Sequence, residues 1–488
     1  FRFARPRDAV TVRHVKSAAF FDLDRTLLVG ASGSVFSQAM RDAGVVTQSF
    51  PGEKALYELF NRIGETLPSM ALARQAATLA KGRSRESVRK VAEAAAPTLL
   101  DMVPPFAHAV IQSHRDAGRM LVMATTTPLD LVEPLARSLG FDAVVATKYG
   151  VRADGTYDGT IDGRFVWSTG KLDAVREWAQ ANDVDLGQSY AYSDSVYDTP
   201  LLSAVGHPHV VNPDPRMVLV AAARRWPVMH FDVPLGVAKI PVVNMELQRL
   251  LLQLARPSFI PFANFDIDGT DHIPDEGPAV ICGNHRSYFD VLAIAVTVAR
   301  SGRPVRFLGK KEVFDAPVIG PLATALGGIR VDRGTGSDEP LRAAADALAA
   351  GELVAIMPEG TIPRGPAFFD PVLKGRWGAA TLAMQAKVPV VPIGLWGTEL
   401  VWPRSSRLPN ILNVTSPPTI QIRVGEPLQL RGKTADSNTK KIMKAIVDLL
   451  PAEARTQRTP TPDELRRSYP AGYKGDPAKE STRRPGTD

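Results

Sequence analysis

The sequence predicts an α/β protein with successive domains in 488 residues. Three observations predict this fold class. Short apolar runs alternate with helical stretches in both halves of the chain, as in parallel sheets covered by helices. An apolar segment with scattered charges at residues 233–262 separates the two halves. The length also exceeds what a single hydrophobic core usually supports, so we expect at least two domains.

The first domain is predicted at residues 17–230, after a basic segment at 1–16. Ala18–Leu23 is a short apolar run with carboxylates at its end, as in a buried parallel strand. A helical insertion rich in Ala, Leu and Arg follows at about 35–114. Later strands are predicted at Met120–Ala124, Ala143–Thr147, Ser189–Ser193 and Val210–Asn212. This order predicts a doubly wound, Rossmann-like parallel sheet that is interrupted early by helices.

Residues 233–262 are rich in Leu, Val and Ile but also carry Lys239, Glu246, Arg249 and Arg256. This composition is typical of an amphipathic helix that lies in a membrane interface. An inter-domain helix packed on a core has the same composition, so composition alone leaves both interpretations open.

The second domain is predicted at residues 263–451. Its strands are predicted at Ala279–Cys282, Val305–Leu308, Leu353–Met357, Val388–Ile393 and Ile420–Val424. Helical stretches separate them, so this domain is also of the α/β class. Residues 452–488 are rich in Pro and charge and poor in aliphatic side chains, which predicts a flexible tail.

The composition excludes several classes of protein. Apolar residues are 44% and charged residues 22%, so the whole chain is not disordered. One cysteine excludes an internal disulfide and a cysteine-based zinc cage. The net charge of +7 suits a phosphorylated substrate or an acidic membrane surface and is too small to indicate nucleic acid. No uninterrupted apolar run reaches about 18 residues, so we expect a cytoplasmic protein that touches a membrane peripherally.

Groups suited to phosphate chemistry follow the strands of the first domain. The strand A-A-F-F-D-L-D-R-T ends in Asp22, Asp24 and Thr26. Two such carboxylates converge on one ligand only if the strand ends and turns between them, as a nucleophile and a general acid require. The later strands and helices supply hydroxyl, ammonium and carboxylate groups at Thr125, Thr126, Thr127, Lys171, Asp194 and Asp198. The last two form an oxygen site that suits Mg²⁺.

This ordered set resembles the haloacid-dehalogenase-like (HAD-like) phosphatases, in the branch that includes phosphoserine phosphatase, over residues 17–225. The resemblance implies that Asp22 attacks phosphorus and forms an aspartyl-phosphate. It implies that Asp24 protonates the leaving group and activates water, and that Thr125 and Lys171 hold the phosphoryl oxygens. The substrate is then a phosphomonoester.

The same resemblance implies a Mg²⁺ ion and a cap. The ion is assigned to Asp22, Asp194 and the backbone carbonyl of Asp24, with Asp198 supporting the metal site. The helical insertion stands where that branch carries its substrate-selecting cap, and it shows no match to a serine-binding pattern.

A second D-x-D-G-T occurs at Asp266–Thr270. The residues before it are not a buried apolar run, and no Thr, Lys and paired Asp follow in register. We therefore predict a strand and a turn there, without chemistry.

A histidine and a carboxylate follow the strand Ala279–Gly283, in the order N-H-R-S-Y-F-D. If the chain turns into a helix between them, Asp290 orients His285 and stabilises its imidazolium, which makes His285 a general base for an alcohol. The pattern is weak alone, but G-I-R-V-D-R, P-E-G-T and V-P-V-V-P-I follow at residues 328–333, 358–361 and 388–393.

The four blocks, within residues 240–430, resemble the glycerophospholipid acyltransferases, which include 1-acylglycerol-3-phosphate acyltransferase. The resemblance implies that His285, oriented by Asp290, deprotonates an acceptor hydroxyl that attacks an acyl thioester, acyl-CoA or acyl-ACP. It assigns the acceptor's phosphate-binding wall to Arg333, Glu359, Gly360 and Thr361. A lysophospholipid acceptor lies in a membrane, which favours an interfacial segment at 233–262 and a peripheral location at the cytoplasmic face.

One residue departs from that family's pattern. Arg commonly follows E-G-T, whereas this chain has Ile362, with Arg364 and Lys374 as candidate replacements. Cys282, in the strand before His285, is predicted to be buried and apolar in role, because the base serves an external alcohol.

The sequence therefore predicts a fusion of a Rossmann-like HAD domain with a helical cap and an α/β glycerophospholipid acyltransferase domain. The expected activities are Mg²⁺-dependent phosphomonoester hydrolysis and acyl transfer to a lysophosphatidate-type acceptor. One alternative keeps the acyltransferase but makes the HAD-like domain a non-catalytic regulatory or binding module. Another is a soluble phosphatase with a structural partner domain.

Overall fold

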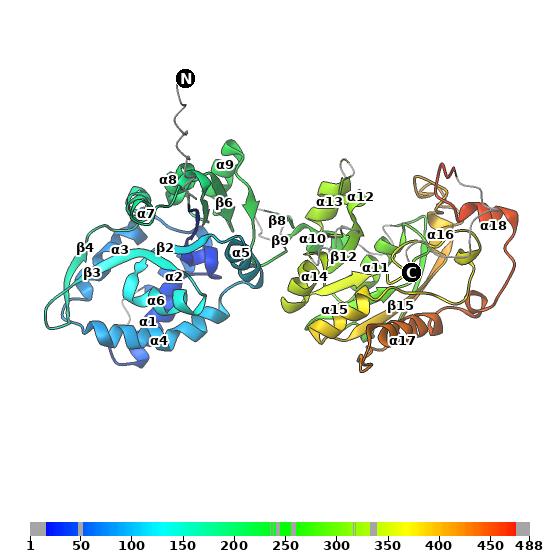
Figure 1. Cartoon of the computed structure of the whole chain (residues 1–488), viewed down its shortest axis with the longest axis horizontal. Coiled ribbons are helices and arrows are strands. Elements are labelled where there is room, and N and C mark those ends of the chain that lie inside the picture. Colours follow the sequence, from blue (N-terminus) through cyan, green and yellow to red (C-terminus); the bar gives the residue numbers. More distant parts are fainter. Residues whose placement is uncertain are drawn as a thin grey trace, which may run out of the picture. The chain divides into compact units, whose positions relative to one another are not determined.

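The computed structural model describes residues 16–46, 52–234, 236–237, 239–240, 245–254, 260–315, 317, 319–331 and 339–474. The chain divides into two compact units, residues 1–235 and 236–488. Figure 1 shows the first from blue to green and the second from green to red. Each unit has its own sheet, and each is described by itself.

The described part of the first unit forms a seven-stranded sheet in the order β4-β3-β2-β1-β5-β6-β7. The strands are β1 (Ala18–Phe21), β2 (Met120–Pro128), β3 (Ala143–Val151), β4 (Tyr157–Asp162), β5 (Tyr190–Ser193), β6 (His207–Val211) and β7 (Val228–Met229). The β3–β4 pair is antiparallel and the other pairs are parallel. Ala19 and Phe21 belong to one core, Ala18 and Phe20 to the other, so β1 is buried on both faces. The predicted doubly wound sheet is confirmed.

The insertion between β1 and β2 is helical, as predicted. It consists of α1 (Ser32–Asp42), α2 (Glu53–Ile63), α3 (Leu67–Leu79), α4 (Arg85–Asp101) and α5 (Pro105–Asp116). Ala107, Val110 and Ile111 of α5 belong to the core of the sheet, and Phe36 of α1 and Leu99 of α4 join the same core. The remaining helices are α6 (Leu129–Ser138), α7 (Thr169–Ala181), α8 (Thr199–Ala204) and α9 (Pro215–Arg224).

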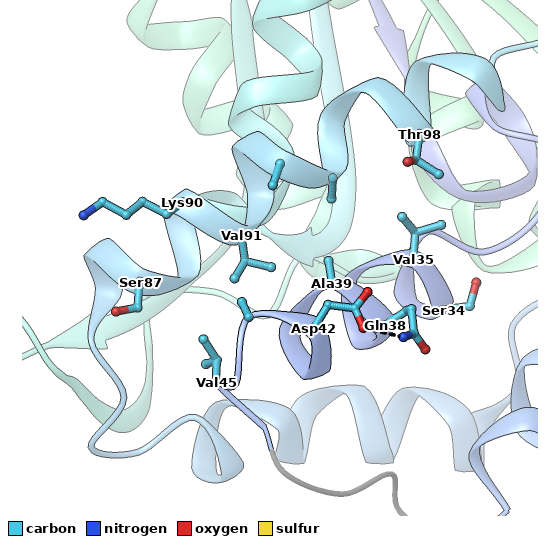
Figure 2. A pocket seen from close by; sticks show the side chains of 13 residues that line it. Ser34, Val35, Gln38, Ala39, Asp42, Val45, Ser87, Lys90, Val91 and Thr98 are labelled. Carbon is cyan, nitrogen blue, oxygen red and sulfur yellow. Dashed lines mark hydrogen bonds between the residues drawn. The ribbon is translucent and has the colours of Figure 1, made fainter.

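An open pocket of about 720 Å³ lies between α1 and α4 (Figure 2). Its walls include the apolar side chains of Val35, Ala39 and Val91 and the polar ones of Gln38 and Lys90. None of the predicted site residues lines it.

A buried histidine on α5 makes the first unit sensitive to acid. The ring of His114 lies in the core, with Nε2 2.7 Å from the Tyr192 hydroxyl. Burial lowers the pKa of His114 to about 4, and the nearby Arg119 and His209 act in the same direction. In the unfolded chain His114 is therefore protonated below about pH 6.5, whereas in the folded unit it is protonated only below about pH 4.

We expect the free energy of unfolding of the first unit to fall by about 2 to 3 kcal/mol, because of His114, as the pH is lowered from 7 to 4. Urea unfolding of the wild type and of His114→Gln, each from pH 7 to pH 4, measures the effect. The wild type should lose stability more steeply than the variant below pH 6.5, and parallel curves would contradict the prediction.

The described part of the second unit also forms a seven-stranded sheet, in the order β10-β16-β15-β11-β14-β12-β13. The strands are β10 (Asn264–Asp268), β11 (Ala279–Gly283), β12 (Val305–Lys310), β13 (Ile329–Val331), β14 (Leu353–Ile356), β15 (Val390–Trp396) and β16 (Thr419–Val424). The β15–β16 pair is antiparallel and the others are parallel. The α/β prediction is confirmed for this unit too.

Helices pack around this sheet. They are α11 (Asp290–Ala299), α12 (Lys311–Asp315), α13 (Ile319–Ala325), α14 (Glu339–Ala349), α15 (Gly378–Ala386), α16 (Thr398–Val401), α17 (Ala435–Asp448) and α18 (Pro462–Arg467). The second D-x-D lies on β10, where Asp266 pairs with Arg423 of β16, and a 3₁₀ turn follows. The predicted strand and turn are confirmed.

The segment predicted as one amphipathic helix at 233–262 is divided. Its described part contains β8 (Lys239–Ile240), β9 (Met245–Glu246) and α10 (Leu247–Leu254). The fully buried guanidinium of Arg306 donates to Glu246 at 2.9 Å, to Gln248 at 2.8 Å and to Glu352 at 2.6 Å. These contacts fix the start of α10 to the sheet, so a single continuous helix is wrong here. Membrane contact of this segment stays a prediction.

Loss of this buried charge should destabilise the second unit. Arg306→Met leaves two carboxylates facing each other without their cation, which typically costs about 3 to 5 kcal/mol. Arg423→Met is the matched control, because its ion pair with Asp266 is partly exposed and contributes about 1 kcal/mol or less. Urea unfolding compares the two variants, and an equal loss in both would refute the difference.

The prediction of a flexible tail from residue 452 is wrong as far as residue 474. α18 begins with a reciprocal cap between Thr461 and Glu464. Ser468 and Tyr469 are buried, and the Ser468 hydroxyl accepts a hydrogen bond of 2.8 Å from Gly365 N–H. Residues 475–488, like the basic segment 1–15, lie outside the described residues.

In the part of the chain that the structure describes, no single helix has the length and apolarity needed to cross a membrane. Helices α4 and α5 meet that test only when joined across a bend of 103°.

Candidate active sites

The two aspartates after β1 lie at a turn. β1 ends at Phe21, Asp22 has extended backbone, and Arg25 adopts a left-handed φ of 61°. The Asp24 carboxylate accepts hydrogen bonds from Ser32 N–H at 2.5 Å and from the Thr127 hydroxyl at 3.0 Å. The strand therefore ends and turns where a converging pair of carboxylates requires it.

Lys171, on the first turns of α7, joins two of the predicted aspartates. Its Nζ lies 2.8 Å from Asp22 Oδ1 and 2.6 Å from Asp198 Oδ2. Burial acts to lower the pKa of Lys171, but the carboxylates of Asp198, Asp22 and Glu65 outweigh it and raise that pKa. The ammonium is thus held charged beside Asp22.

Asp194 follows β5 and contacts a different cation. Its Oδ2 accepts from Arg25 Nε at 2.9 Å, and its backbone N–H donates to Thr26 Oγ1 at 3.0 Å. Burial raises the pKa of Asp194 to about 7, although Arg25 opposes this. Burial also raises the pKa of Asp22, Lys171 lowers it, and the carboxylates of Asp198 and Asp194 raise it further. Buried carboxyl groups therefore lie close together at this edge of the sheet, where Lys171 and Arg25 offset their charge.

The three threonines at the end of β2 make different contacts. Thr125 is buried, and its hydroxyl accepts from Thr127 N–H at 3.2 Å. Thr126 donates to the Val166 carbonyl, and Thr127 donates to Asp24. The structure thus brings Thr127 to the predicted acid, while phosphate binding by Thr125 stays a prediction.

In the second unit, the imidazole of His285 contacts the carboxylate of Asp290. β11 ends at Gly283, α11 begins at Asp290, and the chain between them brings His285 Nδ1 to 2.8 Å from Asp290 Oδ2. The same oxygen accepts from the backbone N–H groups of Arg286 at 2.6 Å and Ser287 at 2.8 Å. Asp290 is fully buried, whereas the His285 side chain is partly exposed. The carboxylate is fixed and the ring is accessible.

The E-G-T block lies beside this histidine. Glu359, which is buried, accepts a hydrogen bond of 2.9 Å from the backbone N–H of His285. Gly360 has a φ of 72°, which an L side chain rarely adopts, so the chain turns sharply after Glu359. Thr361 is half-buried next to this turn. Arg333, the predicted guanidinium of the phosphate wall, lies outside the described residues.

Two family models match this chain. The haloacid dehalogenase-like hydrolase model matches residues 19–203, and the acyltransferase model matches residues 264–396. The inhibition of morphological differentiation protein of Streptomyces azureus is 35% identical over 245 residues, which are 49% of this chain and 88% of that protein. The chain belongs to the haloacid dehalogenase-like hydrolases. It joins that hydrolase domain to an acyltransferase domain.

Two further similarities concern one domain each. A probable phosphatase of Mycobacterium tuberculosis is 34% identical to the hydrolase part over 230 residues, 46% of this chain and 79% of that protein. The crystal structure of a 1-acyl-sn-glycerophosphate acyltransferase from Thermotoga maritima is 22% identical, with a TM-score of 0.31, and covers 41% of this chain and 75% of that one.

Sequence reasoning missed a carboxylate of the hydrolase domain. Glu65, between α2 and α3, accepts from the Ser195 hydroxyl at 2.7 Å and from Trp167 Nε1 at 3.1 Å. Arg25 donates to the carbonyls of Phe60 and Asn61 at the end of α2. The helical insertion therefore closes onto the site through these residues. No motif marks Glu65, because it lies in a short connection within helical sequence.

The carboxylates of the hydrolase domain are oxygen donors, as Mg²⁺ prefers. Among the described residues, no three His, Cys, Asp or Glu side chains are arranged around one metal position. Lys171 and Arg25 instead contact Asp22 and Asp194. Asp198 Oδ1 is buried without a hydrogen-bond partner, and burial and like charges raise the pKa values of Asp22 and Asp194. The chemistry and the charge of this set fit a divalent cation.

The acyltransferase domain contains positioning residues that no sequence block indicated. The hydroxyl of Thr398 on α16 donates to Asp290 Oδ1 at 2.6 Å, and both side chains are buried. Its neighbour Glu399 accepts from Arg286 at 2.7 Å, so α16 holds the histidine loop at two points. Both follow the V-P-V-V-P-I strand, outside the four sequence blocks.

Ile362 stands where that family commonly has Arg after E-G-T, and other basic residues lie around this position. Ile362 is buried, and its carbonyl accepts a hydrogen bond of 2.6 Å from Arg404. Arg364 lies over the ring of Tyr473, 5.2 Å from its centroid, and Lys374 is exposed. Arg404 is therefore a further basic residue that contacts the chain directly after the block. Cys282 is fully buried and burial raises the pKa of its thiol, which confirms its apolar role.

Proposed function

We propose that the acyltransferase domain transfers an acyl group from an acyl thioester to the free hydroxyl of a lysophosphatidate-type acceptor. The observation that carries this proposal is the contact of 2.8 Å between His285 Nδ1 and the buried Asp290. A carboxylate at Nδ1 fixes the tautomer that leaves Nε2 free to accept a proton. The ring is then a general base for an alcohol.

The proposed reaction is balanced without a further reagent. His285 Nε2 takes the hydroxyl proton as the alcohol oxygen forms a bond to the thioester carbonyl carbon. The carbon–sulfur bond breaks, and the imidazolium returns the proton to the departing thiolate. Asp290 stabilises the imidazolium between these steps, and Thr398 holds Asp290 in place.

We propose that the acceptor's phosphate binds near Glu359, Gly360 and Thr361, with Arg333 supplying the guanidinium. The support is that Glu359 lies against the backbone of the base, so a group bound at this turn is close to His285. Guanidinium suits a phosphate because it donates two parallel hydrogen bonds. Such an acceptor, together with the apolar α10 segment, supports a peripheral location at the cytoplasmic face of a membrane.

We also propose that the hydrolase domain removes phosphate from a phosphomonoester, with a glycerolipid phosphate as the first candidate. Asp22 is the nucleophile, forming a bond to phosphorus as the bond to the leaving oxygen breaks. Asp24 protonates that oxygen and then activates water, and Lys171 neutralises the phosphoryl charge. Mg²⁺, held by Asp22 and Asp194 with Asp198 in support, would supply further charge neutralisation at the phosphoryl group.

The alternative of a non-catalytic HAD-like domain is less well supported. Such a domain can lose its nucleophile, acid or lysine without cost. Here Asp22, Asp24 and Lys171 are all present, and Lys171 contacts Asp22.

Two assays on the purified full chain test these proposals. The first measures thioester consumption with lysophospholipids that differ in head group, with His285→Ala as the control. Consumption that depends on His285 and is highest with lysophosphatidate supports the acyltransferase proposal, and equal rates in the control would overturn it. The second measures Mg²⁺-dependent phosphate release from phosphatidate and phosphoserine. No release from any phosphomonoester would favour the non-catalytic alternative.

A further inference from the structure

We propose that the loop between α16 and β16, residues 402–418, docks the acyltransferase domain on an anionic lipid surface. This loop is separate from the α10 segment considered above. Four of its apolar side chains are exposed within a short stretch: Leu408 at 74%, Ile411 at 54%, Leu412 at 86% and Val414 at 52%. Single exposed apolar residues are ordinary on a protein surface, whereas a contiguous group marks an interaction site.

The loop is held in shape by its own hydrogen bonds. Trp402 Nε1 donates to the Ser406 carbonyl at 3.1 Å, and Asn410 N–H donates to the Val401 carbonyl at 2.9 Å. Asn413 donates to the Ser416 carbonyl at 2.8 Å. Polar groups are thus paired within the loop while the apolar side chains face solvent. A loop that is already ordered loses little conformational entropy when it binds.

Charge favours an anionic lipid surface over a neutral partner. No Asp or Glu occurs between Leu400 and Gly425, whereas the loop itself carries Arg404 and Arg407. Basic residues beside exposed leucines are the composition of a segment that inserts at a lipid headgroup boundary.

The base of the loop contacts both halves of the proposed acyl-transfer site. The Ser287 hydroxyl donates to the Trp402 carbonyl at 2.6 Å, and the rings of Tyr288 and Trp402 lie 5.5 Å apart. Arg404 donates to the carbonyls of Ile362 and Pro363, directly after E-G-T. Insertion of the loop tip would place His285 next to the headgroup layer. The choice of a lipid as occupant rests on the proposed function, since its acceptor lies in that layer.

The test is co-sedimentation of the full chain with vesicles of phosphatidylcholine, with and without phosphatidylglycerol. The variant is Leu408→Ser with Leu412→Ser. The matched control is Leu79→Ser with Leu219→Ser, two leucines of the other unit that are exposed at 64% and 73%. Since burying a leucine side chain is strongly favourable, the loop variant should bind about ten- to a hundredfold more weakly. The control should bind as the wild type does, and phosphatidylglycerol should strengthen wild-type binding.

Rates of acyl transfer with two kinds of acceptor distinguish a loss of membrane docking from a loss of catalysis. With an acceptor embedded in vesicles, the loop variant should be slower than the wild type. With a short-chain acceptor dissolved as a monomer, the two should be equal, which also shows that the variant folds. Loop-variant binding equal to the wild type would overturn the proposal, as would a change of oligomeric state without a change in vesicle binding. Vesicle binding that depends on Leu408 and Leu412, without thioester consumption, would uphold docking and overturn the proposed function.

Discussion

His285→Ala is expected to lower acyl transfer at least about a thousandfold, or about 4 kcal/mol of transition-state free energy, while phosphate release is unchanged. The ring is the one titratable side chain that the structure holds against Asp290. Alanine removes the proton acceptor and leaves the buried carboxylate with its contacts to Arg286, Ser287 and Thr398. The domain should therefore stay folded while its chemistry is lost.

Thioester consumption measured against His272→Ala provides the matched control. His272 is a partly buried histidine of the same unit whose Nδ1 contacts the Val424 backbone carbonyl at 2.8 Å and not a carboxylate. Its replacement should leave acyl transfer at the wild-type rate. A loss in both variants would indicate misfolding instead of loss of a base, and unchanged acyl transfer in His285→Ala would refute the proposed mechanism.

The second large effect is expected from Asp22→Asn, which should abolish most phosphate release by the hydrolase domain. An amide is not a nucleophile toward phosphorus, so phosphate release should fall by at least about a thousandfold. Lys171 keeps its contact with Asp198 at 2.6 Å, so its buried ammonium is not left without a counter-charge. We expect acyl transfer by the other domain to be unchanged, and phosphate release from p-nitrophenyl phosphate with Mg²⁺ measures the loss.

The second D-x-D of the chain supplies the control for this variant. Asp268→Asn changes an exposed carboxylate at the end of β10 and should leave phosphate release unaffected. Equal activity of Asp22→Asn and the wild type would show that hydrolysis does not use this carboxylate. Absence of Mg²⁺-dependent release from both proteins would instead favour the non-catalytic alternative.

The parts of the two sites that follow strand ends could be predicted from the sequence. Asp22, Lys171 and Asp198 come from different elements, yet each follows a strand or opens a helix at one edge of a parallel sheet. Side chains that follow the carboxyl ends of parallel strands lie together at that edge, and this does not depend on the details of packing. His285 and Asp290 are close in sequence, so one turn suffices to bring them together.

The remaining contacts depend on tertiary packing that no local pattern encodes. Glu65 reaches the hydrolase site from a connection between two helices, and Thr398 reaches Asp290 from more than a hundred residues away. The tail was predicted to be flexible because it has few aliphatic residues, but Tyr469 and a capped helix fix it. The α10 segment was predicted as one helix because composition does not reveal the buried Arg306.

The packing of residues 462–473 has a consequence for how the enzyme is made. Gly365 and Arg364, directly after the E-G-T block, are covered by Ser468 and Tyr473 from the far end of the chain. A polypeptide still attached to the ribosome has its base and carboxylate long before this cover is synthesised. This turn beside the proposed acyl-transfer site is therefore covered late in translation, and a chain shortened after residue 451 would lack Ser468 and Tyr473 there.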